Sequence, residues 1–255
     1  MKDLVKIIIL SHKRPGKVIT KRILEHPCVS VPEAQAEAYR KQNPECEIIT
    51  HPDSVIGKVP KLQWLLDKFK GCFFLDDDIA SVQRLYFIPG ADEVSKLPVE
   101  NVETLIQNTA AVARELGAFY FGFAKFGRPL MFKPWDPFRL TGYISGHAYG
   151  ILPDSKLSYD PRIQMNDDYY IALLNAFHHR LCFKDNRFYF VQKGTFGSEG
   201  GLAEFRTMDK ERAEFILLRK MFGGAIVPKR KVIGQGQNGA GKVTHQYEKM
   251  LNLPF

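Results

Sequence analysis

The first 80 residues alternate short β-prone runs with segments that carry apolar residues at helical spacing. This alternation restricts the fold more than any other feature of the sequence, because it is typical of a parallel sheet with helices on both faces. The sequence therefore predicts an α/β fold of the Rossmann-like kind, with a mixed, mainly parallel sheet. We expect strands at 5–10, 28–31, 47–50 and 72–75, and helices at 17–24, 33–42 and 59–69.

The rest of the chain is less regular, and we expect it to complete the same single domain. The predicted elements are a helix at 99–116, a strand at 118–123, a proline-containing loop at 125–138, a strand–turn–strand unit at 140–152, helices at 166–177 and 209–221, and a core strand around 188–190. We divide the domain (1–224) into two halves, 1–90 and 91–224. Residues 225–255 are expected to form a basic, glycine-rich loop and helix.

Composition excludes several classes of protein. Hydrophobic residues make up 45% of the chain and charged residues 25%, as in ordinary globular proteins and unlike disordered or coiled-coil chains. The apolar runs are shorter than the roughly 20 residues of a membrane helix, and we find no secretory signal. We therefore expect a cytoplasmic protein, located in the host cytoplasm if the protein is viral. The four cysteines are scattered, which is typical of buried thiols.

The chain is basic, with 36 Lys and Arg against 28 Asp and Glu and a net charge of +8. An excess of this kind favours polyanionic partners such as nucleotide phosphates, nucleic acid or an anionic membrane surface. Charge alone does not choose between them.

Three consecutive aspartates, Asp76, Asp77 and Asp78, follow the predicted fourth strand. Adjacent carboxylates at the end of a buried strand repel each other unless a cation neutralises them. Alternate residues of an extended segment point the same way, so Asp76 and Asp78 can share a ligand, and hard oxygen ligands suit Mg²⁺ or Mn²⁺. The commoner explanation for such a triplet is an acidic turn that caps the next helix.

The acidic triplet at this position resembles the Asp-x-Asp motif of the GT-A class of nucleotide-sugar-dependent glycosyltransferases. The resemblance implies a GT-A fold, a nucleotide-sugar co-substrate and a divalent metal ion. It implies that 1–90 is the nucleotide-binding half and 91–224 the acceptor half, and that 225–255 closes on the site. It also implies that Asp76 contacts the ribose or a metal-bound water, that Asp78 binds the metal, and that Asp77 belongs to the donor site.

Further segments match the GT-A class in the expected order. Ser11, His12 and Arg14 follow the first strand, where the class contacts the nucleotide, and Lys58 and Lys61 resemble basic positions near the base and diphosphate. Asn166-Asp167-Asp168-Tyr169 opens a helix at the place where many GT-A enzymes carry their catalytic base. By resemblance, Asp168 is the base and Asp167 the second candidate, whereas an enzyme that retains anomeric configuration would need no base. Helix capping alone would also explain Asp167.

The C-terminal segment contains a partial P-loop pattern at 236–242, but Val243 occupies the Ser/Thr position and too little chain follows for an NTPase. The segment can still close over a diphosphate through Lys242. GT-A enzymes often take a last metal ligand from a C-terminal histidine, which makes His245 the candidate here, with a surface histidine as the alternative.

Within the GT-A class, the chain most resembles the TET-associated glycosyltransferases of bacteriophages. The shared features are SHKRP, FFLDDDI, NDDYY and GSEGGLAEFR. This resemblance implies transfer of a sugar, from a donor such as a UDP-hexose, to the hydroxymethyl group of a modified pyrimidine in double-stranded DNA. The base would be reached in the groove or rotated out of the helix. The candidate acceptor-binding residues are Gly146, His147, Gly200, Gly201 and Arg206.

Two other functions stay open. One is a bacterial GT-A enzyme that acts on a cell-surface glycan or a small molecule, and the other is a DNA-binding or nucleotidyl-transfer protein that uses the acidic triplet differently. Metal-dependent cleavage of a nucleotide sugar would separate the glycosyltransferases from the last of these.

Overall fold

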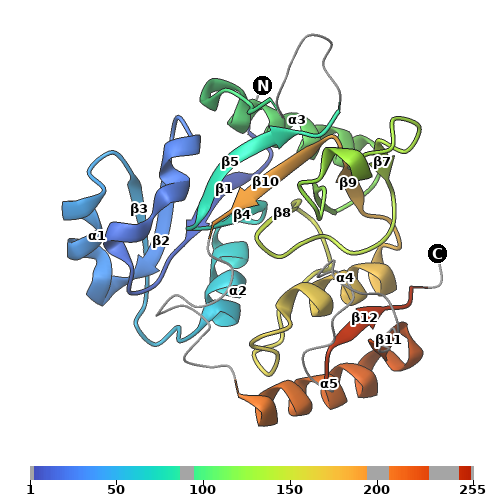
Figure 1. The fold of residues 1–255 in the computed structure, drawn as a ribbon. Helices are drawn as coiled ribbons and strands as arrows, with labels where there is room; N and C mark the ends of the chain where they lie inside the picture. Colours follow the sequence, from blue (N-terminus) through green and yellow to red (C-terminus); the bar gives the residue numbers. More distant parts are fainter. Residues whose placement is uncertain (1–2, 87–94, 194–206, 230–246, 254–255) are drawn as a thin grey trace.

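The computed structural model describes residues 3–86, 95–193, 207–229 and 247–253 (Figure 1). One eight-stranded sheet, in the order β3-β2-β1-β4-β8-β6-β9-β7, runs through the molecule. The sheet is mixed and mostly parallel, which confirms the predicted α/β class. It joins the predicted nucleotide-binding and acceptor halves because β4 of the first pairs with β8 of the second.

The N-terminal half forms the parallel part of the sheet. Its strands pair in parallel because the connecting segments return the chain to the same sheet edge before each new strand starts. The strands are β1 (Lys6–Leu10), β2 (Cys28–Pro32), β3 (Glu47–His51) and β4 (Cys72–Asp76). All four were predicted from local pattern, and their carboxyl ends meet at one edge.

The second half adds strands of both directions. β8 (Ala148–Ile151) runs antiparallel between β4 and β6, and β9 continues in parallel with β6. The other strands of this half are β6 (Tyr120–Phe123), β7 (Phe138–Arg139) and β9 (Phe183–Asp185). The antiparallel direction of β8 brings the residues just before it next to the carboxyl end of β4.

Helices cover both faces of the sheet. Buried side chains of α1 (Ala36–Gln42) and α3 (Val102–Glu115) share one core with alternate residues of β1 and β4, whereas α2 (Lys58–Phe69) and α4 (Asp167–His178) share a second core with the intervening residues. This division follows from the period of two along a strand.

Smaller units complete the fold. β5 (Ile79–Arg84) pairs antiparallel with β10 (Phe188–Gln192) directly after the acidic triplet. α5 (Met208–Phe222) and the ribbon of β11 (Ile226–Pro228) and β12 (Lys249–Leu251) lie beside α4 in a third, smaller core (Figure 1). The described part of 225–255 is this ribbon, and 230–246 lies outside the described residues.

Two local predictions were wrong. The segment expected as a helix at 17–24 forms two short 3₁₀ helices, Pro15–Lys17 and Ile19–Ile23. There the backbone N–H groups of Ile19 and Thr20 donate to the carbonyl oxygen of Asp77 instead of to a helical neighbour. The segment 140–152 has one strand, β8, where two were expected.

All four cysteines are free thiols, as expected. No helix among the described residues is both long and apolar enough to cross a membrane.

Candidate active site

The acidic triplet forms a tight turn between β4 and β5. The hydroxyl of Thr20 donates to the carbonyl oxygen of Asp76 at 2.6 Å and accepts the N–H of Ile79 at 2.8 Å. Because a strand follows the triplet, the three aspartates do not cap a helix. Thr20 therefore fixes the backbone of the turn without using any of its three carboxylates.

Asp77 is the buried member of the triplet. Its side chain accepts hydrogen bonds from the hydroxyl of Ser11 and, at 2.7 Å, from Nη2 of Arg14, and the hydroxyls of Ser11 and Tyr39 lie 2.7 Å apart. Burial raises the pKa of Asp77 to about 6 even though Ser11 and Arg14 favour its charged form. Asp77 thus connects the loop after β1 to the end of β4, and this fixes the predicted nucleotide-side residues.

Asp76 and Asp78 are only partly buried. Oδ2 of Asp76 accepts a hydrogen bond from Nε2 of Gln192 at 3.2 Å. Oδ1 of Asp78 is buried and has no hydrogen-bond partner among the described residues. Burial and the nearby charge of Asp76 raise the pKa of Asp78.

A divalent cation would stabilise this arrangement, because it would bind the unpaired Oδ1 of Asp78 and neutralise the repulsion between the carboxylates of Asp76 and Asp78. The residues therefore fit such an ion through two carboxylates. In the described part of the chain, no group of three or more His, Cys, Asp or Glu side chains is arranged to hold a metal. Phosphate and water would have to complete the coordination, or His245, which lies outside the described residues together with Lys242.

The second acidic pair begins α4, as predicted. The hydroxyl of Tyr143 donates to Oδ2 of Asp168, and the backbone N–H of Tyr169 donates to Oδ1 at 2.8 Å. Burial and the charge of Asp167 raise the pKa of Asp168, which suits a group that must take up a proton. Asp167 is buried and forms a 3.0 Å ion pair with Nζ of Lys58.

The loop before β8 brings the two acidic clusters together. The backbone N–H of Asp76 donates to the carbonyl oxygen of His147 at 3.0 Å. The adjacent Gly146 lies against Asp168 so closely that a Cβ added there would be 2.9 Å from the Asp168 Cβ. Two residues of one loop thus contact the carboxyl end of β4 and the start of α4.

Lys58 is the cation between the two clusters. Burial alone would lower its pKa, but the carboxylates of Asp167, Asp76 and Asp168 together raise it above the ordinary lysine value. Lys58 is therefore charged at neutral pH and partly compensates these three carboxylates.

Other predicted residues support the surrounding structure. Nε2 of His147 donates to the carbonyl oxygen of Phe190 at 3.1 Å, so its Nδ1 accepts from the hydroxyl of Ser145 at 2.7 Å, and burial lowers its pKa. Nζ of Lys61 donates to the carbonyl oxygen of Ser11 at 2.7 Å, and burial lowers its pKa to about 8. The side chain of His12 is 3.2 Å from that of Gln35. Gly200, Gly201 and Arg206 lie outside the described residues.

The structure adds residues that sequence reasoning missed. Tyr143 contacts Asp168 and Gln192 contacts Asp76. Glu214 of α5 is 4% exposed, and its carboxylate accepts the backbone N–H groups of Gln164, Met165 and Asn166, directly before α4. Tyr143 lies three residues before Gly146, a candidate acceptor-binding residue, but nothing in the sequence distinguishes Glu214 from other acids on a surface helix.

Comparison with known proteins identifies the family of the chain. A search of curated proteins finds no match. The family model of the TET-associated glycosyltransferases matches residues 5–201 and so includes both acidic clusters and the loop that joins them. The chain therefore belongs to the TET-associated glycosyltransferases, a family that implies a nucleotide-sugar donor and a modified base of DNA as acceptor.

Proposed function

We propose that the protein transfers a hexosyl group from a UDP-hexose to the hydroxymethyl group of a modified pyrimidine in double-stranded DNA, in phage DNA hypermodification. The observation that carries the proposal is the meeting of the Asp76–Asp78 turn with Asp167 and Asp168 through Gly146 and His147. One cluster is suited to a diphosphate and its cation, and the other to an acceptor hydroxyl.

On the donor side, Asp76 and Asp78 would hold a Mn²⁺ or Mg²⁺ ion. When bound, such an ion stabilises the negative charge that gathers on the departing nucleoside diphosphate. Ser11, His12 and Arg14 lie at the carboxyl end of β1, where nucleotides bind in sheets of this type. Arg14 is oriented by Asp77 and has a buried Nε without a hydrogen-bond partner among the described residues, which leaves a hydrogen-bond donor for a phosphate or ribose oxygen.

On the acceptor side, Asp168 takes the proton of the hydroxymethyl group while its oxygen attacks the anomeric carbon of the sugar. The C–O bond to the diphosphate breaks as the new glycosidic bond forms, with inversion at that carbon. Tyr143 and the N–H of Tyr169 hold the carboxylate in place. Lys58 pairs with Asp167 and orients it beside the reacting groups.

The proposal is tested by incubating the protein with hydroxymethylcytosine or hydroxymethyluracil DNA, Mn²⁺ and a panel of UDP- and GDP-sugars. Digestion to nucleosides and mass spectrometry then report sugar, acceptor and linkage together. We expect a hexosylated pyrimidine that disappears with EDTA. Absence of any glycosylated nucleoside across the panel, with or without hydrolysis of the donor, would contradict the DNA-directed function.

Two variants test the division of labour. Asp78→Ala should abolish metal-dependent binding of the nucleotide sugar, measured by calorimetry. Asp168→Ala should retain donor binding and lose transfer. Asp67→Ala, an exposed aspartate on α2, is the matched control and should leave both unchanged. Equal loss of donor binding in the first two variants would overturn the assigned roles.

A further inference from the structure

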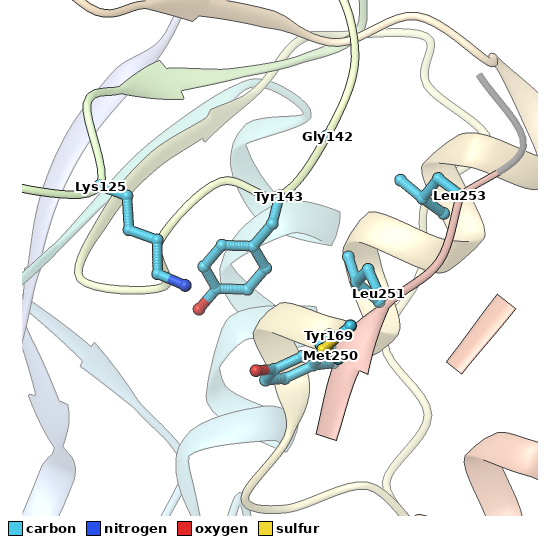
Figure 2. Close-up of a pocket in the computed structure, with 7 residues that line it drawn as sticks. All are labelled: Lys125, Gly142, Tyr143, Tyr169, Met250, Leu251 and Leu253. Atoms are coloured by element: carbon cyan, nitrogen blue, oxygen red, sulfur yellow. The ribbon is translucent and has the colours of Figure 1, made fainter. Parts of the chain in front are cut away.

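A pocket of about 350 Å³ is lined by Tyr143 and Tyr169, the two tyrosines that contact Asp168 (Figure 2). Two tyrosine rings form its polar side, Tyr143 from the loop before β8 and Tyr169 from α4. The remaining lining comes from Lys125, Gly142 and the β12 region with Met250, Leu251 and Leu253. The proposed transfer reaction needs only the hydroxyl of Tyr143 and the backbone N–H of Tyr169. It gives no role to the two aromatic rings or to the pocket that they line.

Both tyrosines of the pocket are bonded to the proposed catalytic base. Tyr143 contacts one carboxylate oxygen of Asp168 through its hydroxyl, and Tyr169 contacts the other through its backbone N–H at 2.8 Å. The hydroxyl of Tyr169 in turn donates to the carbonyl oxygen of Lys249 at 3.0 Å. The ring positions are therefore fixed relative to the carboxylate, with centroids 5.2 Å apart and planes inclined by 41°.

The lining is suited to a flat, uncharged ring. Aromatic faces and the aliphatic side chains of Leu251 and Leu253 offer stacking and apolar contact, and stacking on tyrosine accepts any nucleobase. The volume is near the lower end for ligand sites, which favours one small ring over a disaccharide or an oligomer. Lys125 lies at the exposed rim, with its ammonium 4.7 Å from the centroid of the Tyr143 ring. In the described part of the chain, no carboxylate pairs with it.

We propose that this pocket receives the acceptor pyrimidine after it has rotated out of the DNA duplex. The base stacks on Tyr143 and Tyr169, its hydroxymethyl substituent reaches Asp168, and Lys125 binds the backbone phosphate next to the extrahelical nucleotide. The inference rests on the proposed function, because it takes the acceptor to be a base of duplex DNA. An enzyme must extrude a base that it modifies inside a snug pocket, and the cost of unstacking is offset by contacts of this kind.

The test measures base rotation directly, without donor or metal. A duplex carries one hydroxymethylpyrimidine with 2-aminopurine as its neighbour, and the fluorescence of 2-aminopurine rises when the adjacent base leaves the stack. We expect a rise with the wild-type protein at saturation and little rise with Tyr169→Ala. Tyr169→Phe should keep the rise because the ring remains. Phe177→Ala, an aromatic residue on the same helix that is 73% exposed, is the matched control and should behave as wild type.

Catalysis supplies a second readout. Loss of one stacking ring should raise the KM for hydroxymethylated duplex by about 5- to 150-fold, while the KM for the nucleotide sugar stays unchanged. Tyr169→Leu keeps apolar bulk without an aromatic face, so it serves the same purpose if Tyr169→Ala does not fold. Lys125→Met should weaken binding to modified and unmodified DNA alike and lower the salt dependence of binding by about one phosphate contact.

The outcomes separate this inference from the proposed function. If the mass-spectrometric assay shows transfer but the wild-type protein gives no fluorescence rise, the base is modified without entering the pocket and the inference fails alone. If Tyr169→Ala or Tyr169→Leu raises the KM for the nucleotide sugar instead, the pocket belongs to the donor sugar. If no transfer to DNA occurs at all, the proposed function itself fails.

Discussion

Replacing Glu214 by alanine should destabilise the protein more than any change to an exposed acid. The carboxylate of Glu214 accepts the N–H of Gln164 at 2.7 Å, those of Met165 and Asn166 at 3.1 Å, and Nδ2 of Asn166 at 2.8 Å. Glu214→Ala would leave these hydrogen-bond donors without their acceptor in a region closed to solvent. All of them belong to the three residues that precede α4 and its two aspartates.

The size of the effect follows from these bonds. A hydrogen bond to a charged group contributes about 1.5–3 kcal/mol when its partner would otherwise be buried and unsatisfied. Water can enter the vacated space and satisfy some of the donors. Counting two bonds as lost, we expect the free energy of unfolding to fall by about 3–6 kcal/mol. The control is Glu115→Ala, which removes an exposed glutamate at the end of α3. It should change the free energy of unfolding by less than about 0.5 kcal/mol.

Urea unfolding followed by far-UV circular dichroism measures the free energy of unfolding of wild type and of each variant. The midpoint of the Glu214→Ala transition should move to lower urea with an unchanged slope, and Glu214→Gln, which keeps one acceptor oxygen, should lie between it and wild type. At a urea concentration where Glu214→Ala is still folded, its transfer rate should also be lower than that of wild type. A Glu214→Ala protein as stable as the Glu115→Ala control would refute the reasoning.

Two further predictions concern Asp168. Gly146→Ala should slow transfer by about 10- to 100-fold and leave binding of the nucleotide sugar intact, because the new Cβ would displace Asp168. Gly224→Ala is the control and should have no effect, since nothing lies within 4 Å of its added Cβ. Equal transfer rates for the two variants would count against the contact between Gly146 and Asp168. The rate of transfer should also fall toward acid as Asp168 is protonated at its raised pKa. Asp167→Asn removes a charge that raises this pKa and should move the acid limb of the pH–rate profile to lower pH, whereas Lys58→Met removes a charge that lowers it and should move the limb to higher pH. Shifts in the same direction would contradict the electrostatic account.

The parallel half of the fold was predictable because its signals are local. Each strand of this half is a short β-prone run bounded by polar or helical sequence, and the connecting segments are short. The antiparallel placement of β8 was not predictable, since its partners β4 and β6 lie far away in the chain and its glycine-rich neighbourhood gives no period. The 3₁₀ helices at Pro15–Lys17 and Ile19–Ile23 depend on the backbone of Asp77, another distant contact.

The same distinction applies to the site. Asp76 and Asp78 could be selected because three carboxylates follow a predicted buried strand, whereas Asp168 was selected by its resemblance to the GT-A class. Gln192 and Glu214 could not, since each acts on a residue tens of positions away and has an ordinary neighbourhood of its own. Lys61 was selected as a basic side chain for the diphosphate, and the structure directs it toward the carbonyl oxygens of Ser11 and Ser30, a buried position that the helical period alone does not reveal.

The bond between the Asp76 N–H and the His147 carbonyl has an evolutionary consequence. It extends the β4–β8 ladder, where Leu75 pairs with Ala148, by one residue, so His147 has a fixed position opposite the end of β4. Adding or deleting one residue in the stretch 145–148 would place Gly146 and its neighbours on opposite faces from those they occupy now. The loop could then no longer contact Asp76 and Asp168 together. Related chains should therefore keep the length of this stretch and a glycine at position 146, while loops at the opposite sheet edge remain free to grow.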